Sequence, residues 1–114
     1  CKSVYTIEIH SKLLDKAKKN IKDLNLENIV FKLGNGAEGW KNKILFDNII
    51  ISAASEIIPT SLFGNLKNKG YLIMPKIKPS GNQKLILIKK NYGSYIEKEL
   101  FNVKFVPLLN KAVQ

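Results

Sequence analysis

Residues that could bind a nucleotide stand at the ends of two strand-like segments. Glu8 lies near the end of the β-branched run at 4–9, and Asn35 and Gly36 follow the apolar run at 29–33. A carboxylate at a strand end can accept hydrogen bonds from both hydroxyls of a ribose, although a Glu in this place can equally reach into solvent. The pair Asn35–Gly36 would let the backbone approach a flat ligand, with an amide that both donates and accepts. On these residues alone, a tight Asn-Gly turn is favoured over that role.

The other reactive residue types form no recognisable catalytic or metal-binding arrangement. His10 is the single histidine, and it has neither a Ser or Cys partner nor a second ligand at helical spacing. A surface histidine at a helix start is therefore favoured over a catalytic one. Trp40 is favoured as a loop anchor over a stacking platform. A Walker loop, a nucleophile elbow and the paired carboxylates of a hydrolase are missing from the sequence, so we predict a nucleotide-like site with no catalytic side chain and no metal.

Alternating strand and helix patterns would position these residues. The first elements are a strand at 4–9, a helix that Ser11 can cap and a strand at 29–33, which make a right-handed β-α-β arrangement. The run at 46–52 is the most apolar strand, and we expect it to be central. The remaining elements are a helix from Pro59 to about Lys67, a strand at 71–74 that Pro75 ends, and a hairpin of 85–88 with 95–106. The pattern predicts an α/β fold of parallel units closed by an antiparallel pair, with ligands beyond the carboxyl ends of the strands.

The composition predicts one cytoplasmic domain with a strongly basic surface. The 114 residues have room for one modest core, and no apolar run approaches the ~20 residues that span a bilayer. A single cysteine fits a reducing compartment. The net charge of +10 comes from lysines without any arginine, the residue that dominates phosphate and base recognition. A solvated lysine surface is therefore favoured over a basic face that meets an acidic partner.

Short segments along nearly the whole chain, taken in order, resemble the protein-L-isoaspartate (D-aspartate) O-methyltransferase family. Each segment is weak alone, and their order and spacing carry the resemblance. Ala53-Ala54 followed by Ile58-Pro59, and the closing Phe105–Leu108, separate this family from other class I methyltransferases. The other matching residues are Ile7-Glu8, Gly34–Gly36 with Gly39-Trp40, Phe46-Asp47, Ile49-Ile50, Leu66, Gly70, Leu72 and Pro75.

The resemblance implies a Rossmann-like, doubly wound class I sheet and an S-adenosylmethionine-dependent carboxyl O-methyltransferase. Such an enzyme methylates isoaspartyl residues of damaged proteins, and the ester re-cyclises so that the backbone link can be restored. The substrate carboxylate is already ionised at neutral pH, so alignment matters more than a general base. By the match, Glu8 would hold the ribose of the donor, with Ile9 against the adenosine. The adenine pocket would be lined by Asn35, Gly36 and Ala37, and the isoaspartyl segment would lie near Ala53, Ala54 and Val106, the last through backbone hydrogen bonds.

The match covers the C-terminal part of the family's domain and departs from the family in places. The glycine-rich motif, the first strand and a substrate-binding Ser or Thr would lie upstream of the Glu8 strand, so residues 1–114 would be a single partial methyltransferase domain, incomplete at its N-terminal side. The missing strand normally lies between the Glu8 strand and the strand at 46–52, so two apolar edges would lack a partner. Asn35 stands where the family usually has Asp, which we expect to weaken donor binding by ~1 kcal/mol. Lys69 replaces a glycine of the family.

The expected partners are isoaspartyl proteins and peptides, with no specific nucleic acid and no membrane, and we expect little activity from the chain alone. Two alternatives stay open. The chain could belong to another class I methyltransferase that acts on RNA or a small molecule, or it could be a lysine-rich module that binds without catalysis. Steeply salt-dependent nucleic-acid binding without donor binding would favour the module.

Overall fold

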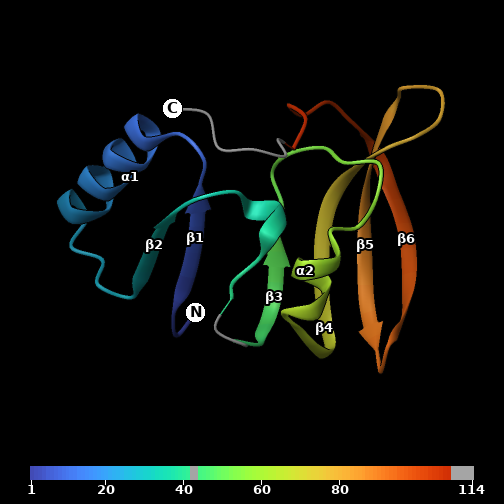
Figure 1. The fold of residues 1–114 in the computed structure, drawn as a ribbon, viewed down its shortest axis with the longest axis horizontal. Coiled ribbons are helices and arrows are strands. Elements are labelled where there is room, and N and C mark those ends of the chain that lie inside the picture. Colours follow the sequence, from blue (N-terminus) through green and yellow to red (C-terminus); the bar gives the residue numbers. More distant parts are fainter. Residues whose placement is uncertain (42–43, 109–114) are drawn as a thin grey trace. The chain divides into compact units, whose positions relative to one another are not determined.

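The chain forms two compact units, and the computed structural model describes residues 1–41 and 44–108 (Figure 1). The first unit includes residues 1–36, and the second consists of residues 37–108. Each unit has its own β-sheet, two-stranded in the first and four-stranded in the second. That the whole chain forms a single partial domain therefore stays a prediction.

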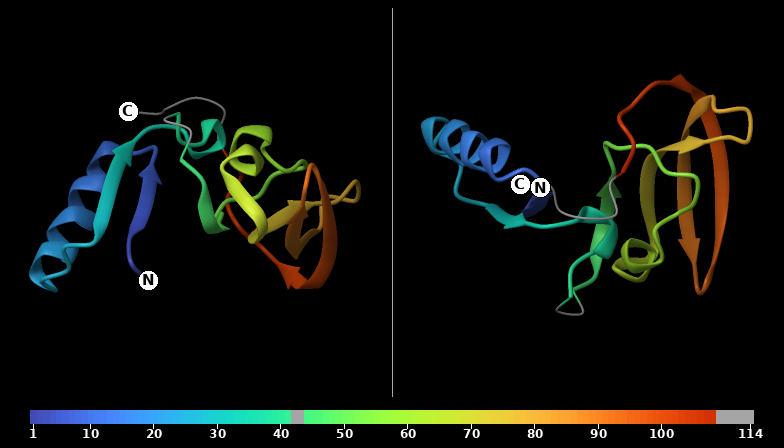
Figure 2. Two further views of the ribbon diagram at one scale, coloured as in Figure 1. Left: turned by 90° about the horizontal axis from the view of Figure 1, so that it is seen from below. Right: turned by 45° about the horizontal axis from the view of Figure 1, so that its top comes forward.

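The first unit is the β-α-β arrangement expected from the sequence. Its elements are β1 (Val4–Glu8), α1 (Ser11–Asp23) and β2 (Ile29–Leu33). The two strands pair in parallel, and Figure 2 shows α1 lying along them. The apolar residues of α1 recur at helical spacing, and one of them, Leu14, is buried. The predicted cap is wrong by one residue, because the extended N-cap is His10 and Ser11 is already helical.

The second unit is a mixed sheet with one short helix. After η1 (Gly36–Glu38), a 3-10 turn at the boundary between the units, its elements are β3 (Phe46–Ile50), α2 (Thr60–Gly64), β4 (Leu66–Ile77), β5 (Gln83–Asn91) and β6 (Ser94–Val103). The strand order is β3-β4-β5-β6, with β3 and β4 parallel and the other neighbours antiparallel. This order confirms parallel α/β units closed by an antiparallel hairpin. The expected central strand, β3, lies instead at an edge of this sheet.

Helix α2 is shorter and β4 is longer than the sequence indicated. The helix ends at Gly64, not near Lys67, and the strand begins at Leu66, not at Tyr71. Leu66 is fully buried in the core, so extended backbone starts directly after the helix cap at Asn65. The gain from burying a leucine, about 1.5–3 kcal/mol, exceeds the small helix propensity of the polar residues that follow.

Pro75 does not end β4, contrary to expectation. The Pro75 carbonyl accepts a hydrogen bond from the Ser55 N–H at 3.2 Å, and the Ile77 N–H donates to the Ser55 carbonyl at 2.9 Å. Because the nitrogen and carbonyl of a strand residue face the same side, the missing N–H of Pro75 removes no bond from the β4–β5 ladder. The strand therefore continues through the proline.

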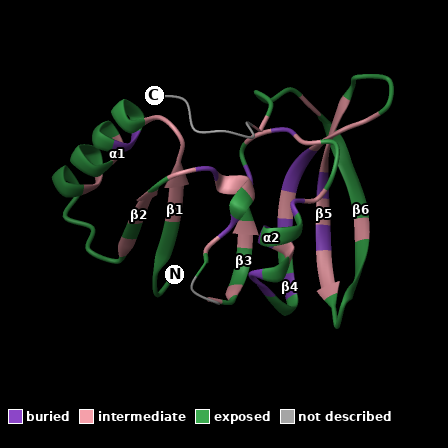
Figure 3. Cartoon of the chain, viewed as in Figure 1, coloured by how far each residue is buried: buried purple, intermediate pink, exposed green. Residues whose placement is uncertain are grey.

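The core of the second unit lies between α2 and one face of the sheet, and Figure 3 shows the buried residues gathered on β4 and β5. Leu72 lies opposite Ile88 and Met74 lies opposite Ile86, and all four side chains are fully buried. Leu62 of α2 belongs to the same cluster. This burial stabilises the unit despite the shortness of its helix.

The opposite face of the sheet and two strand edges expose apolar side chains. Ile50, Ile96 and Phe101 are 80%, 67% and 59% exposed, and their strand partners alternate with core residues, which places them on the face away from α2. Within residues 1–41 and 44–108, β1 pairs only with β2 and β3 only with β4. Each of these two strands therefore keeps one unpaired edge, as predicted.

The close approach of Gly70 to β3 gives a test of this packing. A Cβ on Gly70 would meet the Asp47 carbonyl oxygen and, at 2.9 Å, the Lys67 carbonyl oxygen. We expect Gly70→Ala to lower the free energy of unfolding by about 1–3 kcal/mol, as overpacking does, and urea unfolding followed by circular dichroism would measure it. Gly64→Ala is the matched control, because nothing described lies within 4 Å of its Cβ position. Equal stability of the two variants would contradict the close approach.

Candidate functional site

The Glu8 carboxylate is held in a defined position at the carboxyl end of β1. Its Oε1 accepts a hydrogen bond from the His10 N–H at 3.1 Å, and its backbone carbonyl accepts one from the Gly34 N–H at 2.9 Å. Glu8 is half-buried, so it does not simply extend into solvent. Each carboxylate oxygen has two lone pairs, so Glu8 keeps the capacity to accept from two neighbouring hydroxyls.

The segment after β2 ends at the same edge of the first unit's sheet. Glu8 pairs with Leu33 in the parallel ladder, so Asn35 and Gly36 follow just beyond the partner of Glu8. Neither residue takes the left-handed φ that a two-residue hairpin turn requires, so the favoured tight Asn-Gly turn is not formed. Asn35 is buried, and nothing described lies within 4 Å of a Cβ built on Gly36.

The structure therefore gathers four of the predicted donor-site residues at one edge of the first unit: Glu8, Ile9, Asn35 and Gly36. The fifth, Ala37, follows in η1 as the first residue of the second unit. A carboxylate beside a glycine with open space around it is an arrangement that fits a ribose and a flat ring.

The predicted substrate residues meet in the second unit through backbone hydrogen bonds. The Ala54 N–H donates to the Val106 carbonyl at 2.7 Å, and the Leu108 N–H donates to the Ala54 carbonyl at 2.7 Å. Ala54 is only 1% exposed, whereas Val106 is 71% exposed. Ala54 therefore fixes the position of Val106 and offers little surface of its own. In the part of the chain that the structure describes, the Val106 N–H makes no hydrogen bond, so it is available to a ligand.

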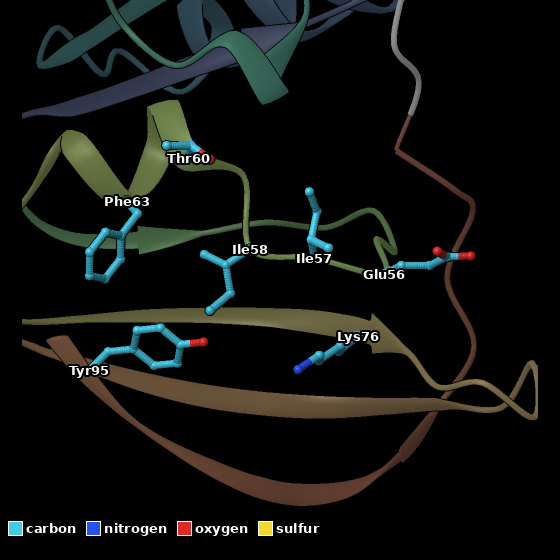
Figure 4. Close-up of a pocket in the computed structure, with 7 residues that line it drawn as sticks. All are labelled: Glu56, Ile57, Ile58, Thr60, Phe63, Lys76 and Tyr95. Atoms are coloured by element: carbon cyan, nitrogen blue, oxygen red, sulfur yellow. The ribbon is translucent and has the colours of Figure 1, made fainter.

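A surface pocket of about 410 Å³ lies next to this segment (Figure 4). Its lining residues come from the loop after β3, from α2, and from β4 and β6: Glu56, Ile57, Ile58, Thr60, Phe63, Lys76 and Tyr95. The rings of Phe63 and Tyr95 meet edge to face, with their centroids 5.7 Å apart. The Lys76 ammonium is paired with the Glu97 carboxylate at 3.2 Å. The positive charge of Lys76 in the pocket is therefore already balanced, and much of the remaining lining is apolar. Nothing in the sequence pattern indicated it.

Lysines of β4, of β5 and of the loop between them lie close to acidic side chains of β6. Lys78 and Glu99 form an ion pair of 2.6 Å. This hydrogen bond, aided by the charges of Lys84 and Lys76, holds the pKa of Glu99 below its ordinary value. The choice between a solvated lysine surface and a basic face that meets an acidic partner stays a prediction, because the net charge of +10 already counts these acidic residues.

Two further residues have structural roles. Trp40 meets Phe46 edge to face, with ring centroids 6.4 Å apart, which supports its interpretation as a loop anchor. Asn65, which sequence reasoning did not single out, is buried and bonds to the Trp40 backbone.

Neither a metal-binding cluster nor a membrane-spanning helix is found in the described structure. No three His, Cys, Asp or Glu side chains among residues 1–41 and 44–108 could together hold a metal ion. No helix of the same residues is long and apolar enough to cross a membrane.

Comparisons with known proteins agree on one family. The family model described as protein-L-isoaspartate(D-aspartate) O-methyltransferase matches residues 1–113. A protein-L-isoaspartate O-methyltransferase of Parvibaculum lavamentivorans is 40% identical over 111 residues, which cover 96% of this chain and 50% of that protein. One of Dictyoglomus turgidum is 42% identical over 107 residues, or 94% of this chain and 48% of that protein.

A solved structure extends the likeness to the fold. A Plasmodium falciparum protein assigned as a protein-L-isoaspartate O-methyltransferase, in complex with S-adenosyl-L-homocysteine, has a TM-score of 0.84 and 28% identity, covering 96% of this chain and 53% of that one. The fold is therefore that of a class I methyltransferase in part, and the chain spans about half the length of the curated relatives it matches. Because the family model matches almost its full length, this chain belongs to the protein-L-isoaspartate(D-aspartate) O-methyltransferase family.

Proposed function

We propose that the protein containing this chain transfers a methyl group from S-adenosylmethionine to the carboxylate of isoaspartyl residues in damaged proteins. The observation that carries the proposal is the edge of the first unit, where the Glu8 carboxylate and the Asn35–Gly36 segment lie together in a chain of this family. A relative with the same fold is in complex with S-adenosyl-L-homocysteine, the product that such a donor leaves.

In this proposal Glu8 accepts hydrogen bonds from the ribose hydroxyls of the donor. The His10 N–H holds one carboxylate oxygen, so the group is oriented before the ligand arrives, which reduces the entropy cost of binding. Ile9 lies against the adenosine. Asn35, Gly36 and Ala37 line the adenine, and nothing described lies within 4 Å of a Cβ position on Gly36 to obstruct its approach.

The substrate would bind along the segment that Ala54 holds. Among the described residues the Val106 N–H makes no hydrogen bond, and Val106 is exposed, which suits a backbone hydrogen bond to an extended isoaspartyl segment, with Ala53 beside it. Because the carboxylate nucleophile is ionised at neutral pH, the protein's residues need only align it and exclude water. The bound donor supplies the methyl group on a sulfonium.

The rest of the donor site would come from a segment upstream of this chain. The matched relatives are about twice as long as the region they share with it. We propose that a strand of this segment pairs with a strand edge that has no partner among the described residues, and that the glycine-rich loop after that strand completes the donor site. The chain alone would then be inactive. A single cysteine supports a cytoplasmic setting.

The activity can be tested directly with isoaspartyl peptide and labelled S-adenosylmethionine. We expect methyl transfer by the chain extended with the upstream residues of its gene, and little or none by residues 1–114 alone. An otherwise identical aspartyl peptide and an RNA pool serve as controls. Transfer to RNA but not to the isoaspartyl peptide would favour another class I methyltransferase that acts on RNA. Activity of residues 1–114 alone would refute the need for an upstream segment.

The role of Glu8 predicts a loss of donor affinity without a loss of fold. Glu8→Gln keeps an oxygen that can accept from the His10 N–H and removes the charge. We expect it to weaken binding of S-adenosyl-L-homocysteine to the extended protein by about 1.5–3 kcal/mol, the usual value for a hydrogen bond to a charged group. Calorimetric titration would measure this. Glu27→Gln makes the same change at an exposed position of the same unit, and an equal effect there would argue against a ribose contact.

The role of Asn35 predicts a change of the opposite sign. Asn35→Asp gives a charged acceptor for the adenine amine, so we expect binding of the same ligand to tighten by about 1 kcal/mol, or roughly fivefold. Asn102→Asp adds the same charge at an exposed position of β6 and should leave the affinity unchanged. If Asn35→Asp weakens binding, Asn35 does not contact the adenine amine.

A further inference from the structure

We infer that Asn65 is a positioning residue for the donor site, a role that rests on the proposed function. Its side chain fixes the backbone around Trp40, and Trp40 follows closely after Ala37, which we place against the adenine. Asn65 lies at the C-terminal end of α2, and the sequence match assigned it no role in the site.

The Asn65 side chain makes three hydrogen bonds, which use both N–H donors of its amide and one of the two lone pairs of its oxygen. Its Oδ1 accepts from the Trp40 N–H at 2.9 Å, and its Nδ2 donates to the Trp40 carbonyl at 3.0 Å and to the Ile44 carbonyl at 2.9 Å. Bonding to both the N–H and the carbonyl of one residue fixes the peptide planes on both sides of it. The side chain is nearly fully buried, at 7% exposure, so water does not compete for these bonds.

The backbone of Asn65 is itself anchored. Its N–H donates to the Ser61 and Leu62 carbonyls at 3.2 and 3.0 Å, and its carbonyl accepts from the Phe46 N–H. The next residue, Leu66, is fully buried in the core. Asn65 therefore projects from a rigid junction of α2, β3 and β4, which is what a positioning group requires.

The loop is also held by contact at Gly39. Gly39 takes a φ of +68°, and a Cβ there would meet the Asn65 Oδ1 and, at 3.1 Å, the Ser61 carbonyl oxygen. Only glycine permits both this conformation and this approach. The loop residues Gly39 and Trp40 thus pack directly onto the end of α2.

The side chain and the backbone of Asn65 bond to different parts of the unit, which distinguishes a positioning role from a general contribution to stability. All three side-chain bonds of Asn65 run to Trp40 and Ile44, and the bonds that cap α2 and join β3 use its backbone. A different side chain at this position could keep the backbone bonds and lose only the bonds to the loop. Loss of the side chain should therefore loosen the segment from Ala37 to Trp40 more than it disturbs α2 or β4.

The test compares Asn65→Leu with Leu62→Ala in the extended protein. Leu62 is a buried core residue of the same helix, so its truncation lowers stability without removing a bond to the loop. We expect Asn65→Leu to weaken binding of S-adenosyl-L-homocysteine about tenfold, equivalent to about 1.4 kcal/mol, and to raise the KM for the donor with little change in kcat.

Trp40 gives an independent readout. It is the single tryptophan of residues 1–114, and any tryptophan of the upstream segment would be replaced by phenylalanine. The emission of Trp40 should shift to longer wavelength in Asn65→Leu and stay unchanged in Leu62→Ala. Wild-type affinity in Asn65→Leu, or equal losses of affinity in the two variants, would overturn the positioning role. A wild-type extended protein that binds no donor would instead overturn the proposed function, and the role with it, even if the emission shifts.

Discussion

Strand β4 is the element on which the second unit depends, because hydrophobic burial sets its place and its backbone sets the place of much else. Leu72 and Met74 are fully buried, and the strand pairs with β3 on one side and β5 on the other. Beyond the end of β3, Lys76 pairs with Ser55, and the residue before Ser55 pairs with Pro107. The proposed substrate segment therefore continues a sheet whose position is fixed by its core.

Backbone groups, more than reactive side chains, make up the proposed site. Gly36 contributes open space, Val106 an N–H, and Ala54 the bonds that hold Val106 in place; only Glu8 contributes a charge. A carboxylate nucleophile needs no base, so alignment is the main demand on the protein. Such a site tolerates wide changes of surface composition, which is consistent with a net charge of +10 carried entirely by lysines.

The sequence predicted the features that depend on local residue patterns. It missed the features that depend on which distant residues a backbone or side-chain group faces in the fold. The strand from Ile29 to Leu33 has the predicted bounds, and Glu8 lies at a strand end as expected, because alternation and strand ends are local properties. Pro75 was wrongly taken to end a strand, since the side to which its nitrogen points is settled only by the partner strands. Asn65 was overlooked because an asparagine after a helix has no distinctive pattern, and its partners lie more than twenty positions earlier in the chain.

The demand for alignment bears on whether this chain can act alone. Glu8 and Asn35, the proposed donor residues, belong to the first unit, and Ala54 and Val106, the proposed substrate residues, belong to the second. Methyl transfer requires the carboxylate oxygen, methyl and sulfur in line at about 3–3.5 Å between the reacting atoms. Each pair of residues can hold its own part of a ligand, but neither pair alone sets that alignment. The proposed upstream segment is therefore a condition for alignment as well as for donor binding, and a chain that keeps most of the proposed contact residues can still lack the reaction.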